Sequence, residues 1–100
     1  MFYHTVLMEL SDVDETFLAK VEHYADRIRR ELPYVRDYRF AKNCAARAQG
    51  YDWVVIGVFD TGSDHDAYQI SPAHQEMKAY MKPHIARLIA CDFDSGHPIQ

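Results

Sequence analysis

Cysteine is scarce in this sequence: Cys44 and Cys91 are the only two in the chain. They lie far apart and form no Cys-x-x-Cys pair, which argues against a zinc site and against a small scaffold held by disulfides. We therefore expect two free, reduced thiols, as in proteins of the cytosol.

Positive charge and long apolar runs are also lacking. Eleven basic residues stand against fifteen acidic ones, and the longest basic cluster is the stretch from Arg27 to Arg30. This gives little electrostatic basis for binding nucleic acid. No segment approaches the roughly twenty apolar residues of a membrane span, and the N-terminus does not resemble a signal peptide. We expect a soluble, unprocessed, cytoplasmic protein that binds neither nucleic acid nor membrane.

The composition is sufficient for one hydrophobic core. Of the 100 residues, 48% are hydrophobic and 13% are aromatic, and a chain of this size usually forms a single domain. We place this domain at residues 1–94. Residues 95–100 have the composition of a turn, which predicts a loose C-terminal tail.

The first half of the sequence predicts a strand followed by a long helix. Residues 2–9 alternate between two faces, as a strand requires, and His4 lies on the more apolar face. Ser11 and Asp12 are candidate N-caps of the helix, and Pro33 ends it. The core-facing positions recur every three or four residues, at Val13, Phe17, Val21, Tyr24, Ile28 and Leu32.

Three further strands and two short helices are predicted after this helix. The strands span 35–42, 51–60 and 85–94, and the helices lie within 60–70 and from Pro72 to about Met81. This order predicts an α+β, ferredoxin-like fold, in which helices cover one face of an antiparallel four-stranded sheet. The strand at 51–60 is apolar on both faces, so the other face of the sheet also needs cover. A second copy of the chain can supply it, which predicts a homodimer.

The segment from Tyr68 to His74, Tyr-Gln-Ile-Ser-Pro-Ala-His, holds the strongest chemical signal. Ser71 is a good N-cap and Pro72 a good first residue of a helix, because proline lacks the N–H that has no partner there. His74 then lies in the first turn, where the helix dipole disfavours the imidazolium form and keeps the ring basic. The same pattern is also typical of residues that only pack and cap at a helix junction.

This segment and its surroundings resemble the stress-responsive dimeric α/β barrel family, often called Dabb. The resemblance covers nearly the whole chain: an early His4 in the first strand, Pro33 after the long helix, Gly50-Tyr51 before the central strand, Phe59-Asp60 at its end, then Tyr68 and Pro72-Ala73-His74. One departure is Ser71, where many relatives carry a second histidine before the proline.

The resemblance implies both an assembly and a site. Dabb proteins pair sheet to sheet into dimeric α/β barrels, with a small-molecule pocket between the helices and the sheet of each subunit. Plant polyketide cyclases of this type use the tyrosine and histidine of the motif, helped by the histidine of the first strand. By resemblance, His74 would remove an acidic proton between two carbonyls, Tyr68 would orient the imidazole or stabilise the enolate, and His4 would hold the substrate oxygen.

On this reading the protein needs no cofactor, and its ligand is an unidentified small apolar or aromatic molecule. Two alternatives stay open. The first is a non-catalytic, stress-related dimeric binding module, because fold-level analogy transfers function poorly. The second is a ferredoxin-like monooxygenase, including one of the haem-degrading kind, which would need a ligating histidine in a wide pocket.

The remaining histidines give weaker signals. We expect His23, on the long helix, and His65, beside two aspartates, to face solvent. His84 follows a helix-breaking proline, and His97 lies in the tail. The histidines form no pair at four-residue helical spacing, so the sequence indicates no metal site.

Overall fold

The computed structural model describes residues 1–96 and has the ferredoxin-like α+β fold that the sequence predicts. Its elements are β1 (Phe2–Leu10), α1 (Glu15–Glu31), β2 (Val35–Lys42), β3 (Trp53–Phe59), α2 (Gly62–Gln69), α3 (Pro72–Met81), a 3-10 turn (Lys82–His84) and β4 (Ile85–Asp94). The four strands are antiparallel and lie in the order β2-β3-β1-β4. The predicted loose tail falls largely at 97–100, outside the described residues.

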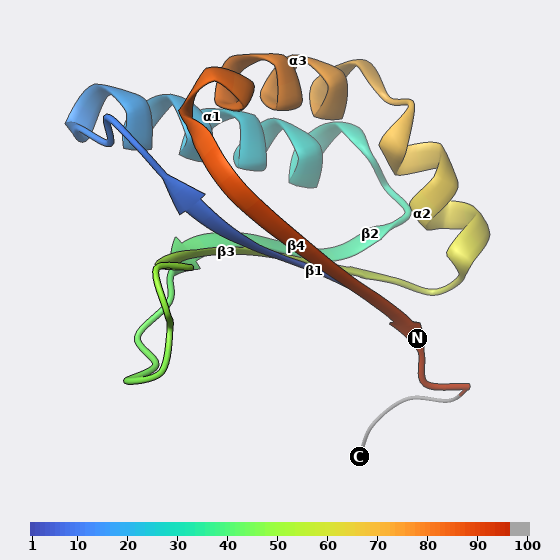
Figure 1. The fold of residues 1–100 in the computed structure, drawn as a ribbon. Coiled ribbons are helices and arrows are strands. Elements are labelled where there is room, and N and C mark those ends of the chain that lie inside the picture. The colour runs from blue at the N-terminus through green and yellow to red at the C-terminus, as the bar shows by residue number, and fades with distance from the viewer. Residues whose placement is uncertain (97–100) are drawn as a thin grey trace.

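The helices lie on one face of this sheet (Figure 1). The core between the two layers is formed by side chains exposed by less than a tenth: Met8, Phe17, Val21, Ala25, Ile28, Leu32, Tyr38, Val55, Phe59, Tyr68, Ala73, Met77 and Met81. Among residues 1–96, no helix is long and apolar enough to cross a membrane. Cys44 and Cys91 are exposed and unbridged, as predicted.

The start of α1 differs from the prediction. Its N-cap is Asp14, whose carboxylate accepts a hydrogen bond from the Phe17 N–H at 2.8 Å. Ser11 does not cap the helix, which begins four residues later at Glu15; its hydroxyl donates to the His84 carbonyl at 3.3 Å. Asp12 adopts a left-handed backbone conformation, with φ of 55°, so the chain turns there before the helix begins.

The junction between α2 and α3 forms as the sequence predicts. Ser71 is the N-cap of α3, and its hydroxyl accepts a hydrogen bond from the His74 N–H at 3.3 Å. The same hydroxyl donates to the Tyr68 carbonyl at 2.7 Å, at the end of α2. Since Pro72 has no N–H to satisfy, the two helices can meet with only Ile70 and Ser71 between them.

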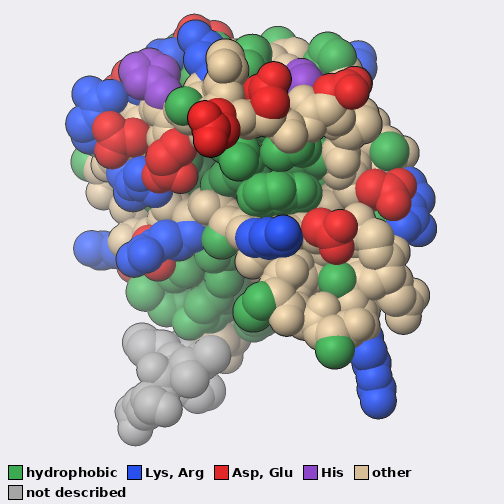
Figure 2. Space-filling model, turned by 90° about the vertical axis from the view of Figure 1, so that its left-hand side faces the viewer, with side chains coloured by type: hydrophobic (Ala, Val, Ile, Leu, Met, Phe, Trp, Pro, Cys, Tyr) green, Lys and Arg blue, Asp and Glu red, His purple; other side chains and the backbone are tan. Residues whose placement is uncertain are grey.

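No helix covers the opposite face of the sheet (Figure 1). Strand register places six large apolar side chains on it, together with Tyr3 and Cys91: Leu7, Val54, Ile56, Val58, Ile89 and Phe93. Phe93 pairs with Tyr3 on the same face, and the exposed fractions of Ile89 and Phe93 are both 47%. Figure 2 shows the side of the molecule that lies on the left in Figure 1. Hydrophobic side chains reach the surface there at the centre of the view and again in its lower part.

The helix-to-sheet core should dominate stability. Ile28 of α1 is completely buried, whereas Ile70, between α2 and α3, is 79% exposed. We expect Ile28→Ala to lower the free energy of unfolding by about 2–5 kcal/mol and Ile70→Ala to change it by less than about 0.5 kcal/mol. Urea unfolding followed by circular dichroism measures both. Equal losses in the two variants would contradict this location of the core.

Candidate active site

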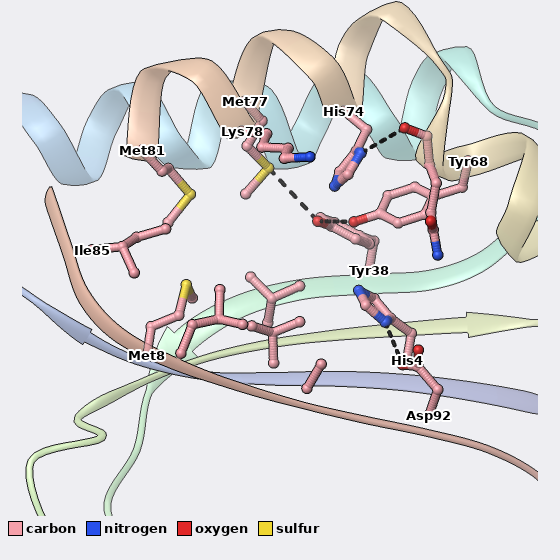
Figure 3. A pocket seen from close by; sticks show the side chains of 15 residues that line it. His4, Met8, Tyr38, Tyr68, His74, Met77, Lys78, Met81, Ile85 and Asp92 are labelled. Atoms are coloured by element: carbon pink, nitrogen blue, oxygen red, sulfur yellow. Dashed lines mark hydrogen bonds and ion pairs between the residues drawn. The ribbon is translucent and has the colours of Figure 1, made fainter. Parts of the chain in front are cut away.

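A cavity of about 300 Å³ lies between the α2–α3 pair and the sheet. It is lined from β1, β2 and β3 by His4, Val6, Met8, Tyr38 and Val55, from the helices by Tyr68, Gln69, His74, Met77, Lys78 and Met81, and from β4 by Ile85, Leu88, Ala90 and Asp92. His4, Asp92 and the aromatic side chains of Tyr38, Tyr68 and His74 gather at one end, Met8, Met81 and Ile85 lie at the other, and Met77 lies between them (Figure 3). The cavity therefore suits a small molecule with a polar, reactive part and an apolar remainder.

His74 reaches the polar end from the first turn of α3. Its Nδ1 lies 3.0 Å from the Gln69 carbonyl oxygen, so Nδ1 carries the proton and Nε2 keeps a lone pair. Burial lowers the pKa of His74; the hydrogen bond with the Gln69 carbonyl opposes this shift, and the neighbouring His4 and Lys78 add to it. The ring is therefore neutral at neutral pH and can accept a proton through Nε2.

Two buried phenols meet below His74. The hydroxyl groups of Tyr68 and Tyr38 are 2.8 Å apart, and the Tyr38 hydroxyl also donates to Sδ of Met77 at 3.6 Å. Burial raises the pKa of Tyr38 to about 12 and that of Tyr68 further still. Both phenols are therefore hydrogen-bond donors and not bases. The Tyr68 ring packs on the His74 ring with centroids 4.3 Å apart, while its hydroxyl bonds to Tyr38 and not to the imidazole.

His4 faces this group from the sheet. Its Nδ1 lies 2.6 Å from a carboxylate oxygen of Asp92, its register partner on β4. The carboxylate fixes the proton on Nδ1. Nε2 of His4, like Nε2 of His74, is therefore the ring nitrogen that can accept a hydrogen bond. The structure thus brings His4, Tyr68 and His74 to the lining of one cavity (Figure 3).

The sequence matches the family model of the stress responsive A/B barrel domain over residues 2–95. The chain belongs to the Dabb family. No curated protein matches it.

Solved structures share the fold of this Dabb chain. A dimeric ferredoxin-like protein of unknown function from Thermobifida fusca is 25% identical, with a TM-score of 0.78 over 92% of this chain and 88% of its own. The hydroxynitrile lyase from Passiflora edulis is 13% identical, with a TM-score of 0.80 and coverage of 97% and 96%. A Dabb family protein from Mesorhizobium loti is 15% identical, with a TM-score of 0.76 and coverage of 99% and 97%.

His65 corrects one expectation from the sequence, because it is buried, with only 3% of its surface exposed. It lies three residues before Tyr68 on α2, so both side chains point to the sheet. Its ring packs 4.5 Å from the His4 ring and 4.8 Å from the Phe2 ring, and Gln69 Nε2 lies 3.2 Å from its nitrogens. This helical spacing was the signal that could have identified it.

Tyr38 and Asp92 are two further polar residues of the site that the sequence does not single out. Alternation along β2 turns Tyr38 toward the helices, but its pairing with Tyr68 depends on how α2 sits above the sheet. Asp92 meets His4 only because β1 and β4 pair in that register. Of the other histidines, His23 is exposed as expected, and His97 lies outside the described residues.

The buried imidazoles should make stability depend on pH. Burial is the main cause that lowers the pKa of both His65 and His74 below the ordinary value of 6.5. Near that pH the unfolded chain binds more protons than the folded one. The stability that these neutral rings contribute is present above about pH 6.5 and is lost as the pH falls toward and through their folded-state pKa values.

We expect the urea concentration at the midpoint of unfolding to decrease when the pH is lowered from about 7.5 to about 5.5, and we expect His74→Gln to make this decrease smaller. His23→Gln, on the exposed face of α1, is the matched control and should leave the decrease unchanged. If the urea midpoint decreased equally with pH in His74→Gln and in the unmodified protein, His74 would not titrate as its burial requires.

Proposed function

We propose that this Dabb protein is a cofactor-independent acid–base catalyst of the polyketide cyclase type, which removes a proton next to a carbonyl group in a small, mostly apolar substrate. The observation that carries the proposal is the pairing of a neutral imidazole with two neutral phenols at one end of a cavity whose other end is apolar. One cavity would thereby hold the base, the oxyanion donors and the space for the substrate.

In this proposal His74 is the general base. Its Nδ1–H donates to the Gln69 carbonyl, which fixes the tautomer and directs the lone pair of Nε2 away from α2. Burial keeps the ring unprotonated at neutral pH. Carbon acids flanked by two carbonyls are acidic enough for an imidazole to deprotonate, so the natural class of substrate is a β-dicarbonyl compound.

Tyr68 and Tyr38 would stabilise the enolate that this step produces. A thioether is a weak acceptor, so the Tyr38 proton can turn from Met77 to the Tyr68 oxygen at little cost. The Tyr68 hydroxyl is then available to donate to the developing oxyanion. Phenols with raised pKa values stay protonated throughout, as oxyanion donors must.

His4 would hold a second substrate oxygen. Asp92 orients the ring by accepting the Nδ1–H of His4, and Nε2 can then accept a hydrogen bond from a hydroxyl group of the substrate. Lys78, exposed at the side of the cavity, can attract an anionic group of the ligand. The methionine-lined end would receive the apolar remainder.

The role of His74 can be tested without the natural substrate. With an aromatic 1,3-diketone, enol-to-keto conversion is followed by ultraviolet absorbance, and we expect His74→Ala to slow the catalysed rate about a hundredfold or more. The free energy of unfolding should change by only about 1 kcal/mol, because Gln75 Nε2 also donates to the Gln69 carbonyl and keeps it paired.

His23→Ala changes a residue on the exposed face of α1 that does not line the cavity, so it is the matched control and should keep full activity. If the unmodified protein were no faster than buffer, the catalytic proposal would fail. Tight binding of the diketone without turnover would then support the non-catalytic binding module, and a Soret shift on adding haem would support the monooxygenase alternative.

We also propose that two copies pair through the uncovered face of the sheet. Dimeric ferredoxin-like structures from Thermobifida fusca and Jannaschia support this, as do the large apolar side chains at the centre of that face. Val54 lies among them, opposite Leu7 on β1 and Ala41 on β2. A second copy would remove these side chains from water, which an isolated sheet cannot do.

We expect size exclusion with light scattering to find a dimer at micromolar concentration. Val54→Asp should convert it to a monomer or unfold it, because the carboxylate would have to be buried without a partner. Ile70→Asp introduces the same charge at an exposed apolar position on the helix side and should leave the dimer intact. A stable monomer of the unmodified protein would refute the pairing.

A further inference from the structure

Three side chains that bind metals well meet next to the polar end of the cavity, where two of them, His4 and Asp92, are part of its lining. His4 comes from β1, His65 from α2 and Asp92 from β4, and one ligand atom of each lies within 4.8 Å of the other two. They are far apart in the sequence, so histidine spacing gives no sign of them. Both histidines are buried, while Asp92 lies on the edge strand β4, where more than a third of its side chain is open to solvent.

Two imidazole nitrogens and one carboxylate oxygen form a donor set suited to transition-metal dications. Imidazole favours zinc, cobalt, nickel and iron over magnesium and calcium, which prefer oxygen ligands. Catalytic zinc sites often have three protein ligands with the fourth position left open. We propose that His4, His65 and Asp92 bind one zinc-class dication, with the open position toward the cavity.

The distances allow this with small side-chain movements. Ligand atoms around a tetrahedral ion with bonds of about 2.0–2.2 Å lie roughly 3.4 Å apart. His4 Nδ1 and Asp92 Oδ1 now lie 2.6 Å apart across a shared proton, and the whole set spans at most 4.8 Å. An ion would replace that proton, spread the first pair and draw in the third ligand, shifts of about an ångström that an exposed edge strand can absorb.

The neighbours of His65 support the site. Its ring is stacked against Phe2 at 4.8 Å and packed against the edge of Phe59 at 5.4 Å, so its direction is fixed before any ion arrives. The Gln69 side-chain amide lies 3.2 Å from its ring nitrogens. With the amide turned so that Oε1 faces the ring, it can accept the N–H of the nitrogen that does not bind metal, as such groups do in known metal sites.

An ion on His4 and Asp92 would take over the place where the proposed function has His4 hold a second substrate oxygen, but it would leave the His74–Gln69 pair and the tyrosine pair as they are. A bound ion with an open coordination position would select ligands that carry a hydroxyl, thiol or carboxylate at the polar end of the cavity.

The experiment uses the full chain with Co²⁺ and Zn²⁺ as probes. Co²⁺ should produce visible d–d bands typical of nitrogen and oxygen ligands, and isothermal titration should find one Zn²⁺ per chain, while Mg²⁺ should produce no signal. We expect Asp92→Asn and His65→Asn each to weaken Zn²⁺ binding about a hundredfold or more and to remove the cobalt bands. Asp92→Asn changes an edge-strand side chain, so it remains informative if His65→Asn fails to fold.

Two controls separate this site from other histidines. His23→Asn removes an exposed surface histidine, and His74→Asn removes the cavity histidine outside the cluster, and both should keep the cobalt bands and the affinity. The proposal would be overturned if Zn²⁺ did not bind, or if Asp92→Asn bound it as tightly as the unmodified protein. Loss of binding in His23→Asn would also overturn it, by placing the ion at the surface.

Discussion

The hydroxyl of Ser71 is the contact on which the site depends most. It donates to the last turn of α2 and accepts from the first turn of α3, so one side chain joins two helices and sets the angle between them. Tyr68 precedes this joint and His74 follows it, and the joint brings their rings to 4.3 Å. A helix junction built for capping thereby becomes the means of placing two functional groups in one cavity.

Burying so many polar groups is possible because they satisfy one another. Among residues 1–96, no buried side-chain nitrogen or oxygen lacks a hydrogen-bond partner. Tyr38 pairs with Tyr68, His74 with a backbone carbonyl, and His4 with Asp92. Unpaired, each would cost about 1–3 kcal/mol of stability. The network therefore holds each group in a defined tautomer and direction, which a solvated side chain would lack.

Most of the fold could be predicted from the sequence, because hydrophobic period and helix caps are local signals. The bounds of β2, α3 and β4 agree with the prediction, and β3 is shorter than predicted by a few residues at its ends. The start of α1 was predicted too early, since the hydroxyl of Ser11 donates to His84, a partner distant in sequence, and Asp14 caps the helix instead. The same holds for the site: the Tyr68–His74 motif is local, whereas Asp92 beside His4 depends on strand register.

His65 shows how composition can mislead. Its two aspartate neighbours suggested a position facing solvent, yet on the predicted helix α2 the ring lies on the side facing the sheet, against Phe2 and His4. Helical position decided its environment, and the polarity of adjacent residues did not.

The two ends of the cavity differ in stiffness. Met8 and Met81 line the apolar end, and their unbranched, polarisable side chains can change rotamer at little cost. Hydrogen bonds and ring packing fix the polar end. If the proposed function holds, ligands of different tail length or branching would share one headgroup geometry, so the protein would select by the headgroup and tolerate variation in the tail.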